Sequence, residues 1–102
     1  MTKYSVAVHK PTASQSEKIS AAFRDRGFGW WHWIDGFWLV SDSSGVFTAS
    51  AIRDLVKPIC PDSNILVLAV VEGQGWSGTG KRKGDKNMFS WLHKNLAPKK
   101  DI

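Results

Sequence analysis

Residues 30–40 read WWHWIDGFWLV, two aromatic and β-favouring runs on either side of an Asp-Gly pair. Asp-Gly is a preferred centre for a tight hairpin, because both turn residues of that hairpin adopt positive φ. A two-residue turn pairs Trp33 with Trp38. Two residues further from the turn it pairs Trp31 with Val40, on the same side of the hairpin. The other side then carries Trp30, His32, Ile34, Phe37 and Leu39, so we expect a hairpin that is apolar on both sides.

Strand and helix patterns alternate around this hairpin. Residues 4–8 place Tyr and Val at every second position, which is typical of a half-buried strand. A helix of about 13 residues is predicted next, with a capping box formed by Ser14 and Glu17. Thr48 precedes a second helical pattern. Residues 64–72 form a nearly continuous apolar run, which suits a central strand of a sheet.

The order strand, helix, strand, strand, helix, strand predicts an α+β fold of the ferredoxin-like βαββαβ type. This fold has a four-stranded antiparallel sheet with two helices on one face. A glycine-rich basic loop over residues 73–86, with five glycines and four basic residues, and a short C-terminal helix are expected to follow. We expect a single domain over residues 1–97 and a basic tail over residues 98–102.

The uncovered face of the predicted sheet suggests self-association. An apolar hairpin with helices on one side only would leave a large hydrophobic patch, which soluble monomers rarely expose. A two-fold homodimer is the simplest way to cover it. We expect its interface to contain Trp31, Trp33 and Trp38.

Length and composition limit the class of protein. The chain has 102 residues and a mass of 11.4 kDa, which fits one small domain. Its longest apolar run, residues 65–71, is far shorter than the roughly 20 residues of a membrane-spanning helix. No secretory or transit leader is recognisable, so we expect a cytoplasmic protein without a membrane partner. The one cysteine, Cys60, excludes an intramolecular disulfide and is expected to be buried.

The positive charge is concentrated at the end of the chain. Residues 1–77 contain seven Lys or Arg and seven Asp or Glu, whereas residues 78–102 contain seven basic and two acidic residues. The net charge of +5 therefore belongs to the last quarter of the sequence. This asymmetry indicates an anionic partner, although a solubilising tail would have the same composition.

The glycine-rich loop and two hairpin residues form the predicted binding site. The sequence from Gly75 to Lys81 has the spacing of a phosphate-binding loop, but Arg82 stands where magnesium would need Ser or Thr. We expect phosphate contacts through backbone amides and basic side chains, with aromatic residues stacking on a base. No cofactor, metal site or catalytic group is predicted. The candidate residues for binding a nucleotide or phosphate are Trp76, Gly78, Gly80, Lys81, Arg82, Lys83, Lys86, Trp30 and His32.

Several segments resemble the small bacterial and phage proteins of the SinR family. They are GWWHWIDGFWLV at 29–40, IRDL at 52–55, DSNILV at 62–67 and WLHKNL at 91–96, together with Pro58, Gly73, Trp76 and Gly78. The resemblance covers nearly the whole chain. It implies a fold similar to the ferredoxin-like group of CRISPR-adaptation and VapD-type endoribonuclease proteins, which form dimers through their sheets.

One position departs from the pattern of the nuclease-like group. In those proteins the first strand typically ends in an aspartate that helps to hold a metal, whereas here the corresponding residue is His9. A lone histidine is a poor ligand for magnesium, which prefers oxygen donors. The resemblance therefore implies a degenerate metal site.

These observations favour a non-catalytic homodimer that binds a nucleotide or a nucleic acid. A phage or defence-associated setting, with the protein sequestering a nucleotide, would fit. One alternative is a ribonuclease that uses His9 or His32 as acid–base groups. Another is an inhibitor that binds a host enzyme through its basic surface.

Overall fold

The computed structural model describes residues 2–71, 76–77, 79–80 and 89–96 of the chain. Contacts divide the chain into two compact units, Met1–Val70 and Val71–Ile102, whereas the sequence led us to expect one domain over residues 1–97. The first unit contains all the described strands and two helices, and the second contains one helix. The elements are β1 (Thr2–Val8), α1 (Ala13–Asp25), β2 (Gly29–Ile34), β3 (Phe37–Asp42), α2 (Ala49–Val56), β4 (Ile65–Val70) and α3 (Phe89–Leu96).

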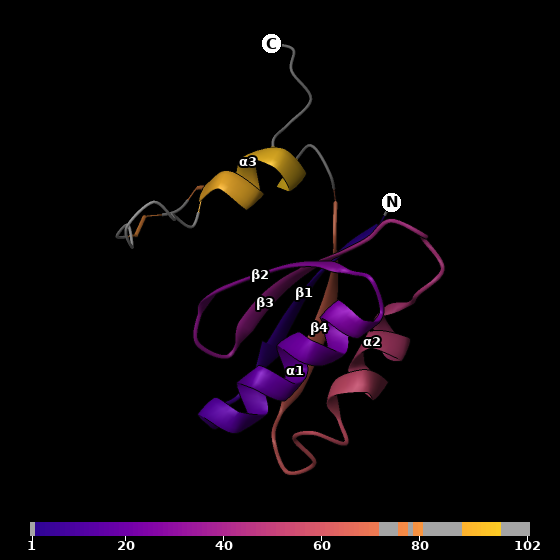
Figure 1. Ribbon diagram of the computed structural model, residues 1–102, viewed down its shortest axis with the longest axis vertical. Coiled ribbons are helices and arrows are strands. Elements are labelled where there is room, and N and C mark those ends of the chain that lie inside the picture. Colours follow the sequence, from indigo (N-terminus) through magenta and orange to yellow (C-terminus); the bar gives the residue numbers. More distant parts are fainter. Residues whose placement is uncertain (1, 72–75, 78, 81–88, 97–102) are drawn as a thin grey trace. The chain divides into compact units, whose positions relative to one another are not determined.

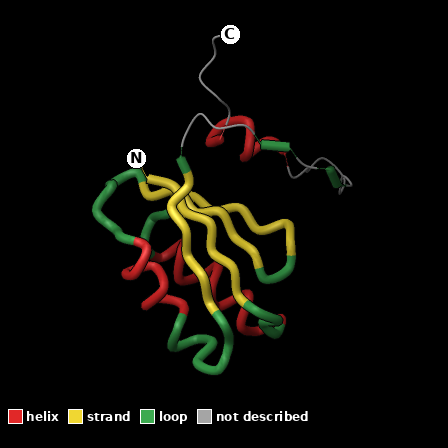
Figure 2. Tube along the Cα trace, turned by 180° about the vertical axis from the view of Figure 1, so that it is seen from behind, coloured by secondary structure: helices red, strands yellow, loops and turns green. Residues whose placement is uncertain are grey.

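The first unit has the predicted ferredoxin-like α+β fold. Its four strands lie in the order β2-β3-β1-β4, and every neighbouring pair is antiparallel. Helices α1 and α2 cover one face of the sheet, and within this unit the other face carries no helix (Figures 1 and 2). The element order, the antiparallel sheet and the placement of both helices on one face are therefore confirmed.

The core lies between the sheet and the two helices. Trp38, Phe23, Ile19, Ile52 and Val6 are all fully buried there. The rings of Trp38 and Phe23 meet edge to face with centroids 6.4 Å apart. The indole N–H of Trp38 donates to Ser20 Oγ at 3.0 Å, so its polar atom is satisfied inside the core.

Threonine side chains begin both helices of this unit. Thr12, rather than Ser14, caps α1: its hydroxyl accepts from the backbone N–H of Gln15, whose side chain accepts from the Thr12 N–H. The expected Ser14–Glu17 capping box is therefore wrong by two residues. Thr48 caps α2 as predicted and accepts from the N–H of Ala51 at 3.1 Å.

The hairpin has a different register from the one expected. Trp31 pairs with Leu39, and Ile34 pairs with Phe37, so both His32 and Trp33 lie opposite Trp38. This extra residue in β2 is a β-bulge, which reverses the side of every residue beyond it relative to a regular ladder. Trp31 consequently shares a face with Phe37, whose ring it meets at 6.2 Å, and the expected Trp31–Val40 pair is wrong.

The turn of the hairpin docks on the end of β1. Of its two central residues only Gly36 has positive φ, +73°, so the expectation for Asp35 is not met. The N–H of Val8 donates to the carbonyl oxygen of Gly36 at 2.7 Å. A Cβ added at Gly36 would lie 2.5 Å from the carbonyl oxygen of Val8, so both the conformation and the close approach require glycine.

β4 is an edge strand, and its expected central position is wrong. Its only neighbour in the sheet, over the described residues, is β1. Its side chains alternate: Ile65 and Val67 pack against the core, whereas Leu66 and Leu68 are 57% and 54% exposed. Apolar side chains therefore lie on both faces of this strand, although only one face packs against the core.

The loop after β3 is organised by a buried carboxylate. Asp42 accepts hydrogen bonds from the N–H and hydroxyl of Ser44 and from the N–H of Phe47. Burial alone would raise the pKa of Asp42, but these hydrogen bonds outweigh it and hold the pKa below its ordinary value. The carbonyl of Phe47 in turn accepts from the Tyr4 hydroxyl at 2.7 Å, which connects the loop to β1.

Replacing Gly36 by alanine should destabilise the fold more than the same change at Gly45. Both residues have positive φ, but an added Cβ at Gly45 meets nothing within 4 Å. We expect Gly45→Ala to lose about 1 kcal/mol through backbone strain and Gly36→Ala to lose roughly 1–3 kcal/mol more through overpacking. Urea unfolding of both variants measures the difference, and equal losses would contradict the close approach of the turn to Val8.

The Asp42 carboxylate should make folding stability depend on acid pH. Because its pKa is lowered in the folded state, its stabilisation is complete above the ordinary aspartate pKa of about 3.9 and is lost as the pH falls through the lowered folded value. Asp42→Asn should cost about 2 kcal/mol at pH 6 and less at pH 2. Urea unfolding at both pH values tests this, with Asp62→Asn, an exposed site, as the control. A loss for Asp42→Asn that does not change with pH would disprove the assignment.

Candidate functional site

A groove runs between α1 and β2 on the helix side of the sheet, at the β2 edge. Its volume is about 560 Å³. Helix α1 contributes serine, alanine and charged side chains, and β2 contributes two aromatic rings. The lining residues are Ser16, Glu17, Lys18, Ser20, Ala21, Arg24, Trp30 and His32.

The helical period explains why four of the six α1 residues line one groove. Ile19 and Phe23 point into the core. Glu17, Ser20, Ala21 and Arg24 follow the spacing i, i+3, i+4, i+7 and therefore form a stripe beside the core-facing one. These residues could not be singled out from the sequence, because an exposed charged stripe on a helix looks like an ordinary solvated face.

Trp30 and His32 are the two hairpin residues predicted to contact a ligand, and the structure brings them together. Trp30 pairs with Val40 on the helix side and packs against the core. The imidazole of His32 stacks on the buried indole of Trp38, with ring centroids 4.0 Å apart and planes 5° from parallel. Both rings therefore have positions fixed by the sheet, and both line the groove.

One hydrogen bond fixes the proton on His32. Its Nδ1 lies 3.0 Å from the carbonyl oxygen of Phe37. A carbonyl oxygen only accepts, so Nδ1 carries the hydrogen and Nε2 of the neutral ring is an acceptor. The structure gives Nε2 no partner among the described residues, which leaves this nitrogen for a ligand in the groove.

The groove carries two cations and one anion. Lys18, Arg24 and Glu17 are all exposed. Arg24 Nε lies 4.0 Å from the carboxylate of Asp25, a distant pair with both side chains largely in solvent. Ser16 Oγ is buried at the groove wall and has no hydrogen-bond partner in the described part of the chain. The arrangement has aromatic surface and positive charge side by side.

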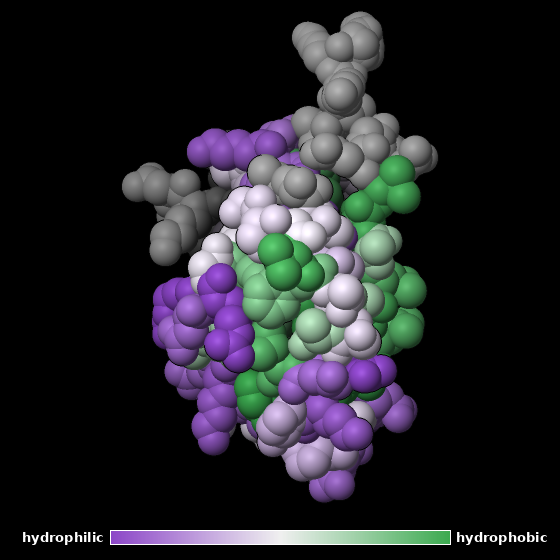
Figure 3. Space-filling view, turned by 90° about the vertical axis from the view of Figure 1, so that its right-hand side faces the viewer, coloured by the Kyte–Doolittle hydropathy of each residue, from purple (hydrophilic) through white to green (hydrophobic). Residues whose placement is uncertain are grey.

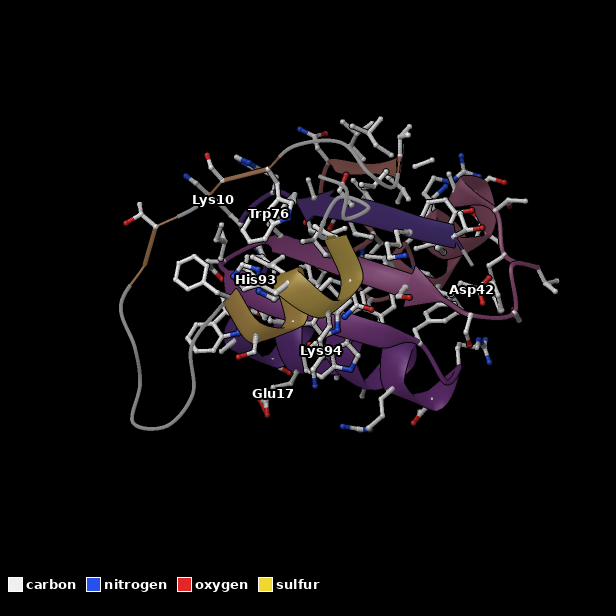
Figure 4. All side chains as sticks on the ribbon, turned by 90° about the horizontal axis from the view of Figure 1, so that it is seen from above. Lys10, Glu17, Asp42, Trp76, His93 and Lys94 are labelled. Carbon is white, nitrogen blue, oxygen red and sulfur yellow. The ribbon has the colours of Figure 1, made fainter. Side chains whose placement is uncertain are left out.

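The predicted residue Trp76 lies in the second unit. Its ring contacts the imidazole of His93 on α3, with centroids 5.3 Å apart (Figure 4). His93 is followed by Lys94, and both residues stand in the last turn of α3. Gly80 is also described there, outside helix and strand. Gly78, Lys81, Arg82, Lys83 and Lys86 lie outside the described residues.

Of the three tryptophans expected at a dimer interface, only one has substantial exposed surface. Trp38 is fully enclosed under the helices and has no surface to offer a partner, which corrects that expectation. The bulge is the cause, because it turns Trp38 and Trp31 to opposite faces. Trp31 is 4% exposed and Trp33 is 37% exposed.

Other candidate groups are dispersed. His9 is exposed at the end of β1, where its backbone N–H donates to the backbone carbonyl oxygen of Asn64 at 3.0 Å. Cys60 is buried as predicted, and burial raises the pKa of its thiol. In the part of the chain that the structure describes, no three His, Cys, Asp or Glu side chains converge as metal ligands. None of the described helices has the length and apolar character to cross a membrane.

Comparisons with models of protein families, with curated proteins and with solved structures each found no match.

Proposed function

We propose that this protein is a non-catalytic, cytoplasmic homodimer that binds a nucleotide or a nucleic acid. The observation that carries the proposal is the α1–β2 groove, whose lining combines the rings of Trp30 and His32 with the side chains of Lys18 and Arg24 and one carboxylate, Glu17. The resemblance to SinR-family proteins and a phage or defence-associated setting belong to the same proposal.

The chemistry of the groove matches the two parts of a nucleotide. An aromatic ring held by the fold offers a face on which a base stacks, a contact that contributes roughly 1–3 kcal/mol per base. Nearby cations bind the phosphate through charge-assisted hydrogen bonds. His32 Nε2 adds an acceptor for an exocyclic amine of a base.

The C-terminal unit supports the same class of ligand. Trp76 contacts His93, and Lys94 follows on α3. This part of the sequence also holds the whole net positive charge, since residues 78–102 contain seven basic and two acidic residues. Such a segment attracts polyanions over a distance of about one Debye length, roughly 8 Å at physiological salt.

Removing the groove cations should weaken binding. We expect the double variant Lys18→Gln, Arg24→Gln to raise the Kd for a labelled single-stranded oligonucleotide about tenfold, equivalent to about 1.4 kcal/mol. The matched control is Arg26→Gln, Lys57→Gln, which removes two exposed cations outside the groove. Fluorescence anisotropy, with mononucleotides as competitors, provides the measurement. Equal losses in the two double variants would show that the groove is not the site, and no binding of any nucleotide or oligonucleotide at low salt would end the proposal.

The basic loop should determine the salt dependence of binding. The triple variant Lys81→Gln, Arg82→Gln, Lys83→Gln should reduce the slope of log K against log salt by about 2, at about 0.7 for each lost contact to a single-stranded phosphate. A triple variant of Lys10, Arg26 and Lys57 to glutamine controls for total charge. Binding with no salt dependence, together with tight binding of a mononucleotide, would identify the small ligand instead of a polymer. Cleavage of the oligonucleotide would favour the ribonuclease alternative.

A further inference from the structure

The two edges of the sheet are built differently. The β2 edge contains a bulge between Trp31 and Ile34. Such irregularities, like charged side chains and prolines, normally prevent an edge strand from pairing with another chain. The β4 edge has none of them: residues 65–70 read ILVLAV, and β4 pairs regularly with β1 over its whole length. Within the described residues of the first unit, β4 is therefore an unprotected edge.

The exposed apolar side chains of β4 add to this edge. Leu66 and Leu68 lie on the sheet face that α1 and α2 leave uncovered, and more than half of each is exposed. On the side of the molecule that carries α2, hydrophobic residues form a band between hydrophilic ones (Figure 3). An edge without a described neighbour and exposed apolar side chains therefore occur together on one strand.

We propose that β4 pairs antiparallel with β4 of a second copy of this chain, which joins the two sheets into one eight-stranded sheet. A two-fold axis perpendicular to the sheet relates such strands and keeps α1 and α2 of both copies on one face. Residues opposite each other then share a face. Pairing centred on Val67 places Leu66 opposite the partner's Leu68, and pairing centred on Leu68 places Leu66 opposite the partner's Val70. Neither register brings charges together.

The surroundings of β4 have room for this partner. A groove of about 340 Å³ lies along the strand between it and α2, lined by Ala49, Ser50, Arg53, Ile65, Leu66 and Val67. It can receive the side chains that the partner's strand directs to the helix side. Arg53 forms a 3.0 Å ion pair with Asp54, so its charge is balanced when a second copy brings another Arg53 nearby. A strand without charged side chains pairs best with another uncharged strand, and β4 of a second copy is such a strand.

This inference assigns the interface of the proposed homodimer, and it rests on that part of the proposed function alone. It replaces the expected interface of Trp31, Trp33 and Trp38. The ligand takes no part in it, so the experiment is made without nucleotide, and a failure to bind nucleotide would leave the interface intact.

Light scattering on the full chain should report twice the mass of 11.4 kDa at micromolar concentration. Leu68→Lys places a charge close to its own copy across the two-fold axis, and we expect the dimer dissociation constant to rise at least tenfold. The control Val46→Lys adds the same charge at a 75% exposed site outside β4 and should leave the dimer unchanged. A monomeric wild type, or equal effects of the two variants, would overturn the proposal.

Hydrogen exchange distinguishes edge pairing from packing of the open faces. In an edge strand, alternate amides bond to the neighbouring strand and the remainder point outward. At a concentration where the dimer forms, the outward amides of residues 65–70 should become protected at least tenfold, whereas Leu68→Lys should return them to fast exchange. A dimer in which these amides still exchange rapidly would place the interface elsewhere.

Discussion

The burial of Trp38 is the constraint on which the rest of the first unit depends. This side chain contacts Phe23 of α1, donates to Ser20 of the same helix and supports the imidazole of His32 on β2. It therefore joins three elements through one ring. A side chain of this size fits under α1 only if it lies on the helix side of β3. Because β3 pairs regularly with β1 and Trp38 lies opposite Val6, this placement also fixes which side chains of β1 and β3 face the helices.

The bulge in β2 follows from the same requirement. A regular two-residue hairpin would place Trp31 and Trp38 on one face of the sheet. The extra residue separates them, so that Trp38 lies in the core while Trp31 packs on Phe37. Local sequence could predict the hairpin and its apolar character, because these depend on residue types near the turn. It could not predict the register, because the register depends on packing against a helix that precedes the hairpin.

The candidate site shows the same division between local and tertiary information. Trp30 and His32 are two positions apart on one strand, with one residue between them, so the sequence could predict that they share a face. Lys18 and Arg24 belong to a helix, where exposed charged residues are typical of any solvated surface. Only the position of β2 beside α1 turns that surface into the wall of a groove. The aromatic half of the site was thus predictable and the cationic half was not.

The apolar run of β4 illustrates why composition alone does not give the position of a strand. Strands buried on both faces are usually central, and the apolar run of β4 suits such a position. In the structure one face of β4 packs on the core, the other belongs to the uncovered side of the sheet, and its outer edge has no described neighbour. The apolar run over residues 65–71, which is typical of a central strand, therefore belongs to an edge strand in which Leu66 and Leu68 are more than half exposed. The apolar pattern of a strand therefore indicates that both of its faces can carry buried side chains, whereas its place in the sheet depends on which other strands pair with it.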